Sequence, residues 1–262
     1  MAKLVPLFSS SKGNSYYLSG NGNAILVDAG RNAKQIENAL FQNDLSMNDV
    51  GAILVTHEHI DHCSAIKVLA KRYALTVYGT KGTLEALFEQ DKIDSKTKTE
   101  VIEDEVAIGD FGVIRVDTSH DARESCGYFI TTPDMRKCSF VTDTGFLMQS
   151  AKEALKMSNA AVIESNHDIE MLKCGPYPYI LKKRILSSTG HLSNVDCAVE
   201  LPKLVNAGLT RIILAHLSEE NNKPDIALST SKKSLDNAGF VMNKDYTMAV
   251  APVETNGKYI TF

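Results

Sequence analysis

The sequence predicts an α/β fold in which two β-sheets pack face to face between two outer layers of helices, a four-layer αββα sandwich. Two observations support this fold class. The chain falls into two halves, each with a β-rich stretch followed by alternating strands and helices, and sheets of this kind bury one face on each other and cover the other with helices. Polar residues follow several predicted strands, so we expect the functional loops along one edge of the sandwich.

The first half opens with short β-rich runs, and the turn Gly20-Asn-Gly separates the second strand from the third. The run Gly51–Thr56 is short, apolar and β-rich, which is typical of a strand buried on both faces. The elements predicted here are strands Lys3–Phe8, Tyr16–Ser19 and Ala24–Asp28, helix Ala33–Asn43, strand Gly51–Thr56, helix Cys63–Tyr73, strand Thr76–Tyr78 and a Thr80-capped helix to Gln90.

The second half repeats this order. Four strands are predicted at Glu105–Ile108, Gly112–Asp117, Gly127–Thr131 and Ser139–Thr142. They are followed by helix Ala151–Met157, strand Ala160–Glu164, helices Ile169–Lys173, Pro178–Leu186 and Asn194–Val205, strand Arg211–Ala215, helix Lys223–Asn237 and strands Tyr246–Val250 and Tyr259–Phe262. No linker, repeat or low-complexity stretch marks a boundary, so we expect residues 1–262 to form one domain.

Composition and charge restrict the location and the partners. No apolar run is long enough to span a bilayer, and the first ten residues read as a strand rather than a signal peptide, so we expect no membrane partner and a cytoplasmic location. The net charge of −4 argues against bulk attraction to nucleic acid. A local basic patch is still compatible with this net charge. Lys182, Lys183 and Arg184 form the densest basic cluster, and a solvated helix face explains that cluster as well.

The five cysteines are scattered and no CxxC occurs, so we expect buried, reduced thiols rather than a disulfide framework or a zinc ribbon.

The segment Thr56–His62 contains the residues that indicate a metal site. Its side chains His57, His59, Asp61 and His62 can all bind metal, and they stand directly after the buried strand. Grouping three histidines without a ligand would cost desolvation or mutual repulsion. In an extended loop His57 and His59 point the same way, while Asp61 and His62 can turn toward a second position. Nitrogen and carboxylate donors together suit Zn²⁺ or Mn²⁺.

Three more metal-competent residues stand at predicted strand ends. His120 follows Gly112–Asp117, Asp143 follows Ser139–Thr142 and His216 follows Arg211–Ala215. A single histidine in such a place is most often structural, but a sheet edge can present several donors to one point. Beside the His-x-His-x-Asp-His cluster, these three residues favour a shared metal site.

These motifs resemble the metallo-β-lactamase superfamily, with Asp28 as the remaining motif at the end of an early strand. The resemblance implies that His57, His59 and His120 hold one metal, that Asp61, His62 and His216 hold a second, and that Asp143 bridges the two. It also implies a hydroxide nucleophile between two divalent ions, Zn or Mn, oriented in part by Asp61, and an Asp28 that accepts a hydrogen bond from the cluster.

Three further segments resemble the YycJ/WalJ/VicX group of that superfamily: Ser9–Ser15, Glu164–Asp168 and Ser188–Asn194. That likeness implies a 5′-to-3′ DNA exonuclease. His191 follows a glycine turn and precedes Ser193 and Asn194 at a helix start, where free backbone N–H groups would form an anion pocket. We therefore expect His191 to bind a substrate phosphate or donate a proton, with Ser193 and Asn194 as substrate-binding neighbours.

Two segments leave alternatives open. The pair His167-Asp168 is either functional or a helix start capped by Asn166. The Ser9–Ser15 loop either cradles a phosphate or makes a tight β-turn.

Two enzymatic functions compete. The leading one is a phosphodiesterase that acts on DNA ends, and the alternative is a hydrolase of a small ester, thioester or lactone, which the acidic net charge fits slightly better. The chain between Asp143 and His216 is too short for the cap domain of RNA-processing members of the superfamily. A di-iron redox protein is disfavoured because His59 is present, and the full donor set argues against a non-catalytic scaffold.

Overall fold

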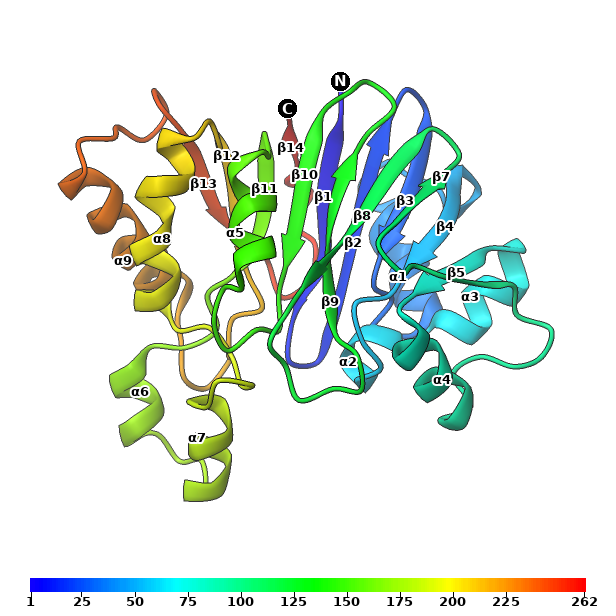
Figure 1. Ribbon diagram of the computed structural model, residues 1–262, viewed down its shortest axis with the longest axis horizontal. Helices are drawn as coiled ribbons and strands as arrows, with labels where there is room; N and C mark the ends of the chain where they lie inside the picture. The colour runs from blue at the N-terminus through cyan, green and yellow to red at the C-terminus, as the bar shows by residue number, and fades with distance from the viewer.

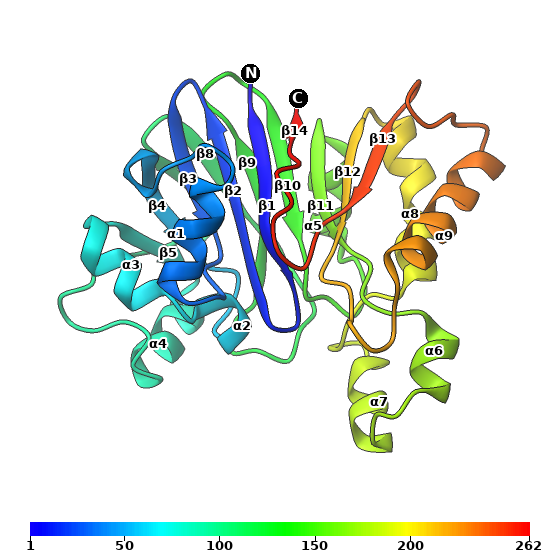
Figure 2. The ribbon, with the colours of Figure 1, turned by 180° about the vertical axis from the view of Figure 1, so that it is seen from behind.

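The structure is a computed structural model, and it describes all residues from Met1 to Phe262. Two seven-stranded sheets face each other (Figures 1 and 2). In spatial order the first sheet holds β14 (Ile260–Thr261), β1 (Lys3–Ser10), β2 (Gly13–Gly20), β3 (Asn23–Val27), β4 (Val50–Leu54), β5 (Thr76–Gly79) and β6 (Thr99–Val101). The second holds β13 (Thr247–Val250), β12 (Arg211–Ala215), β11 (Ala160–Glu164), β10 (Lys137–Val141), β9 (Cys126–Thr131), β8 (Phe111–Asp117) and β7 (Glu105–Ile108).

Each sheet is antiparallel in one part and parallel in the other. Strands β14 to β3 and β7 to β10 pair antiparallel, whereas β3 to β6 and β10 to β13 pair parallel. Parallel neighbours need crossover connections, which here run through helices. The carboxyl ends of the parallel strands in a sheet therefore meet at one edge, and the functional loops leave from it.

Three apolar clusters separate the four layers. The central one fills the space between the sheets, where the rings of Tyr16 and Phe140 pack with centroids 5.8 Å apart. A second lies between the first sheet and the helices α1 (Ala33–Phe41), α3 (Ile66–Tyr73) and α4 (Lys81–Glu89). The third lies between the second sheet and the helices α5 (Gln149–Lys156), α8 (Asn194–Asn206) and α9 (Pro224–Asn237). The predicted αββα sandwich is confirmed, and Thr80 caps α4 as expected.

The remaining helices lie at the edge with the functional loops. They are α2 (Ile60–Cys63), α6 (Ile169–Cys174) and α7 (Tyr179–Ile185), with a single 3₁₀ turn, η1 (Met47–Asp49), elsewhere. Helices α6 and α7 project from the body in both views (Figures 1 and 2). None of the helices combines the length and apolar character that a bilayer crossing requires.

The structure corrects three expectations. The helix predicted over Cys63–Tyr73 is broken, because the carbonyl of His62 accepts from the N–H of Ala29 (2.8 Å) and the N–H of Ala65 donates to the carbonyl of Ala29 (2.9 Å). These bonds tie the histidine loop to the end of β3 and interrupt the helix.

The other two differences concern exposed residues. Strand β6 was not predicted, because its three residues are all exposed and carry no burial pattern. Four cysteines are buried and free as expected, but Cys174 is exposed because it ends the projecting helix α6.

Candidate metal centre

The loops that follow five strands converge at one edge of the sandwich. Strand β4 leads to His57, β8 to His120, β10 to Asp143, β12 to His216 and β3 to Asp28. The short helix α2 adds Asp61 and His62. The structure thus brings together all seven residues for which the sequence predicts metal binding, within one continuous cluster of donor atoms.

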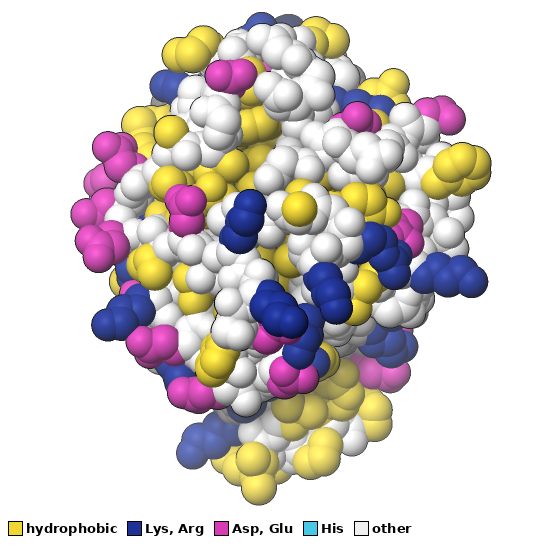
Figure 3. Space-filling view, turned by 90° about the vertical axis from the view of Figure 1, so that its right-hand side faces the viewer, with side chains coloured by type: hydrophobic (Ala, Val, Ile, Leu, Met, Phe, Trp, Pro, Cys, Tyr) yellow, Lys and Arg dark blue, Asp and Glu magenta, His cyan; other side chains and the backbone are white.

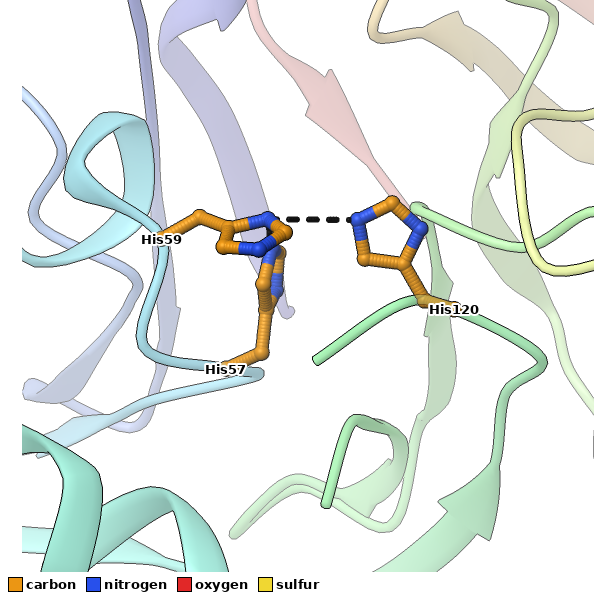
Figure 4. A group of neighbouring side chains, drawn as sticks. All are labelled: His57, His59 and His120. Atoms are coloured by element: carbon orange, nitrogen blue, oxygen red, sulfur yellow. Dashed lines mark hydrogen bonds between the residues drawn. The ribbon is translucent and has the colours of Figure 1, made fainter. Parts of the chain in front are cut away.

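Three imidazoles form the first group. The Nδ1 atom of His59 lies 3.0 Å from Nε2 of His57 and 3.3 Å from Nε2 of His120 (Figure 4). The outer nitrogens are anchored, since Nδ1 of His57 contacts the Thr56 hydroxyl (3.1 Å) and Nδ1 of His120 contacts the carbonyl of Gly190 (3.1 Å). These anchors leave the three inner nitrogens facing one point, which is the arrangement that a histidine-bound metal requires.

Asp61, His62 and His216 form the second group. The Oδ2 atom of Asp61 lies 3.5 Å from Nε2 of His62 and 3.6 Å from Nε2 of His216. Asp28 holds the far side of His62 through an Nδ1–Oδ2 contact of 2.8 Å and also accepts from the backbone N–H of Thr56 (2.9 Å). Asp28 therefore lies behind the donors and orients them.

Asp143 lies between the two groups. Its Oδ2 is 3.3 Å from Nε2 of His62, and its Oδ1 is 3.8 Å from Nε2 of His120. The side chain is buried, and neither Oδ2 of Asp143 nor Nε2 of His216 has a hydrogen-bond partner. Buried polar atoms without partners are costly, and both of these atoms face the other donors.

The electrostatics fit divalent cations. Burial, and then the neighbouring imidazoles of His62 and His120, lower the pKa of His57, which keeps this ring in the neutral form that binds metal. Burial alone would lower the pKa of His216, but the nearby carboxylates, led by Asp143, outweigh it and raise the pKa to about 10. The carboxylates around His216 therefore favour positive charge at this position. Five imidazole and two carboxylate donors match Zn²⁺ or Mn²⁺.

Backbone conformation also marks this edge. Asp28, Asp143 and His216 have φ angles of 61°, 54° and 55°, in the left-handed region that residues other than glycine rarely occupy. Such strain persists where the surrounding structure holds it, often at functional sites. Gly30, in the loop after β3, permits the close approach of this loop to α2, because a Cβ at Gly30 would lie 1.7 Å from the carbonyl oxygen of Asp61.

Glu164 is a central residue that sequence reasoning missed. Its Oε1 accepts from Nδ1 of both His191 and His216, at 2.8 Å each. Its Oε2 accepts from the backbone N–H groups of Thr144 (2.9 Å) and Leu192 (3.1 Å). This fully buried carboxylate thus fixes both rings with Nδ1 protonated. Two signals were available: Glu164 is the last residue of the predicted strand Ala160–Glu164, and it begins the segment Glu164–Asp168 that resembles the YycJ/WalJ/VicX group.

His191 reaches the cluster, as the sequence predicts. It lines a cavity of about 300 Å³ together with Ser11, His59, Ile60, Asp61, His120, Asp143, Arg184 and His216. Its Nδ1 is bound by Glu164, so Nε2 is the nitrogen left for a substrate.

The expected anion pocket beside His191 is not formed. The backbone N–H groups of His191 and Leu192 are bound to the Ile185 carbonyl and to Glu164, so they are not free. Ser193 caps α8 by accepting from the N–H of Asp196. Asn194 is buried and bonded to Ser165 and Asn222. Neither Ser193 nor Asn194 lines the cavity.

In both segments that the sequence left open, some residues have structural roles. Asp168, and not Asn166, caps α6, whereas the Asn166 amide donates to the carbonyl of His216 (2.8 Å). Burial lowers the pKa of His167 to about 4, and neither of its ring nitrogens has a partner.

The Ser9–Ser15 segment forms the tight hairpin turn between β1 and β2, and Ser11 in this turn lines the catalytic cavity. The Asn14 amide of this hairpin lies 3.1 Å from Nε2 of His62, and the Ser9 hydroxyl accepts from the N–H of His216 (2.8 Å). The hairpin therefore supports the second group of donors.

Comparison with known proteins agrees with this geometry. Residues 23–217 match the model of the β-lactamase superfamily domain. The chain is 40% identical over 237 residues to exodeoxyribonuclease YycJ of Bacillus anthracis, covering 89% of each protein. It is 35% identical over 252 residues to exodeoxyribonuclease WalJ of Streptococcus pneumoniae D39, covering 92% of this chain and 90% of the relative.

Solved structures share the fold. The metallo-β-lactamase fold protein YhfI from Bacillus subtilis aligns with a TM-score of 0.73 at 17% identity, over 99% of this chain and 98% of YhfI. Zn²⁺-bound PqqB from Methylobacterium extorquens aligns with a TM-score of 0.70 at 14% identity, over the whole of both chains. At these identities the likeness concerns the architecture alone.

Proposed function

This chain belongs to the β-lactamase superfamily and is a metal-dependent hydrolase, and we propose that it acts as a 5′-to-3′ DNA exonuclease with two divalent ions, zinc or manganese. The observation that carries the proposal is His191, which is held by Glu164 beside a seven-donor cluster and faces the same cavity. The relatives named exodeoxyribonucleases support DNA as the substrate. A DNA substrate also agrees with the expected cytoplasmic location.

Two groups of side chains would hold the ions. His57, His59 and His120 would bind one, Asp61, His62 and His216 the other, and Asp143 would contact both. When bound, such ions lower the pKa of a coordinated water and neutralise charge on the phosphodiester.

Side chains of the protein would position the attacking water and protonate the leaving oxygen. Asp61 is the one cluster carboxylate that is partly exposed to the cavity, so it can accept a hydrogen bond from the attacking water and orient it. His191 would donate a proton from Nε2 to the leaving oxygen. The Glu164 carboxylate at Nδ1 fixes the ring orientation, which leaves Nε2 as the nitrogen that can face the leaving oxygen.

Labelled DNA tests the proposal. The purified chain, loaded with Mn²⁺ or Zn²⁺, is incubated with 5′- or 3′-labelled single- and double-stranded DNA, with RNA of the same sequence, and with a lactone panel. A 5′-to-3′ exonuclease releases the 5′ label at once as a short product, whereas the 3′-labelled strand shortens progressively. Asp61→Ala should abolish both while the fold is retained. Lactone hydrolysis without cleavage of any phosphodiester would replace the proposal with the small-ester alternative.

A further inference from the structure

We propose that the face of α7 is the docking surface for the single-stranded DNA that extends out of the catalytic cavity. This inference rests on the proposed nuclease function and deepens it. The surface is a shallow groove of about 520 Å³ lined by Lys173, Tyr179, Lys182, Lys183, Leu186 and Ser187, and we call it the α7 groove. It lies on the projection that α6 and α7 form at the functional edge (Figures 1 and 2).

The α7 groove has the charge that a DNA strand requires. Three of its six lining residues are lysines and none is a carboxylate, although the chain as a whole has a net charge of −4. The Lys183 side chain is exposed and makes neither an ion pair nor a hydrogen bond within the protein, and Lys182 is held by the backbone carbonyl of Lys173 (2.7 Å). Ammonium groups that are not paired internally are available to phosphates.

The groove also offers a stacking surface. Tyr179, Lys182, Lys183 and Leu186 stand at helical positions i, i+3, i+4 and i+7, so they share one face of α7. Tyr179 is 79% exposed, an unusual state for a large ring, and Leu186 is exposed two turns further on. Proteins that bind single strands combine a positive groove with aromatic rings on which bases stack. In a DNA duplex the faces of the bases are stacked on one another and cannot contact a tyrosine ring. The combination of lysines and an exposed ring therefore favours a single strand.

Continuity with the catalytic cavity distinguishes this groove from other basic surfaces. Arg184 lies on the same helix and lines the catalytic cavity. Its guanidinium is held there by two hydrogen bonds, of 2.5 and 2.7 Å, to Asp121, the neighbour of His120. The chain then runs from α7 through Gly190, whose carbonyl anchors His120, to His191. A strand whose end lies at the metal centre can therefore continue onto the α7 groove.

A second basic surface provides a matched control. Lys and Arg side chains also gather on the α3 and α4 side of the molecule (Figure 3), where a cavity of about 360 Å³ is lined by Lys67, Lys71, Lys96 and Lys98. This cavity includes Asp94, lacks an aromatic residue and shares no lining residue with the catalytic cavity. The variant K96A/K98A removes the same charge as K182A/K183A, at a site that the strand would not reach.

The test measures binding of the metal-loaded chain to a fluorescent 20-nucleotide phosphorothioate oligo(dT), which resists cleavage. Each phosphate contact to a single strand contributes about 0.7 to the slope of log Kd against log salt. The variant K182A/K183A loses two such contacts, so the slope should fall by about 1.4. At 0.1 M salt this change corresponds to binding that is roughly 25-fold weaker. Tyr179→Ala should weaken binding about tenfold without changing the slope, and Tyr179→Phe should retain binding. K96A/K98A should match the wild type.

Turnover of the dinucleotide pTpT separates this inference from the nuclease function. A dinucleotide does not extend to the groove, so wild type, K182A/K183A and Tyr179→Ala should cleave it equally, which also shows that the variants fold. If the wild type cleaves long DNA but K182A/K183A binds it like K96A/K98A, the docking surface is refuted and the nuclease stands. If the wild type cleaves neither substrate, both proposals fail. If Tyr179→Ala changes the molar mass in light scattering but not the DNA affinity, the face is an interface between copies and the inference is overturned.

Discussion

Replacing Glu164 with glutamine removes one acceptor from a site where both oxygens are needed. Oε1 accepts from two imidazoles, and Oε2 accepts from the backbone N–H groups of Thr144 and Leu192. In either amide orientation of Glu164→Gln, the new NH₂ group faces two donors. Each buried donor left without an acceptor costs about 1–3 kcal/mol, so we expect a loss of about 4 kcal/mol in the free energy of unfolding. In a domain of this size that loss lowers Tm by roughly 8–16 °C.

The protein can avoid part of this cost only by changing an imidazole tautomer. His216 would then carry its proton on Nε2 and could no longer bind metal through that atom, and we expect metal affinity to fall about 10- to 100-fold. The assay combines Tm of the metal-free chain with metal content by mass spectrometry. Glu153→Gln is the control, because Glu153 is exposed on α5. If Glu164→Gln matches this control in both Tm and metal content, the positioning role of Glu164 is wrong.

Three more changes test the site. His191→Ala should keep its metals and slow DNA cleavage by roughly 10²–10⁴-fold, with a smaller loss on a nitrophenyl phosphodiester whose leaving group needs no proton; a fall in metal content would remove His191 from the catalytic residues. Gly30→Ala should displace Asp61, because the added Cβ meets its carbonyl at 1.7 Å, and a shift of about 1 Å can cost 10²-fold in rate; wild-type turnover would show that the loops move apart freely. Asp28→Ala deprives His62 of its partner and should lower metal affinity about 10- to 100-fold in chelator competition, and an unchanged affinity would contradict the anchoring role.

The metal-binding residues could be predicted because they follow strands with clear sequence signals. Buried parallel strands appear as short apolar runs, and the polar residue after each run, such as His57 or His216, lies at a shared sheet edge. Asp28 and Asp143 follow the same rule, whereas His120 follows β8, an antiparallel strand in which buried and exposed residues alternate. The layer order also follows from the alternation of strands and helices.

The features that were missed depend on contacts between distant segments. Glu164 belongs to the strand itself, and its role appears only when the loops carrying His191 and His216 fold over it. The helix break after Cys63 arises from hydrogen bonds to Ala29. Ser193 looked available for a phosphate, but helix capping uses its hydroxyl. A local pattern shows which groups a segment offers, and it does not show which partners occupy them.

Anomalous scattering from crystals of the chain loaded with Mn²⁺ or Zn²⁺ tests the two-metal centre most directly. We predict two peaks about 3.5–4 Å apart, one among His57, His59 and His120 and the other among Asp61, His62 and His216, with Asp143 touching both. A single peak, or peaks outside these donors at full metal loading, would contradict the account.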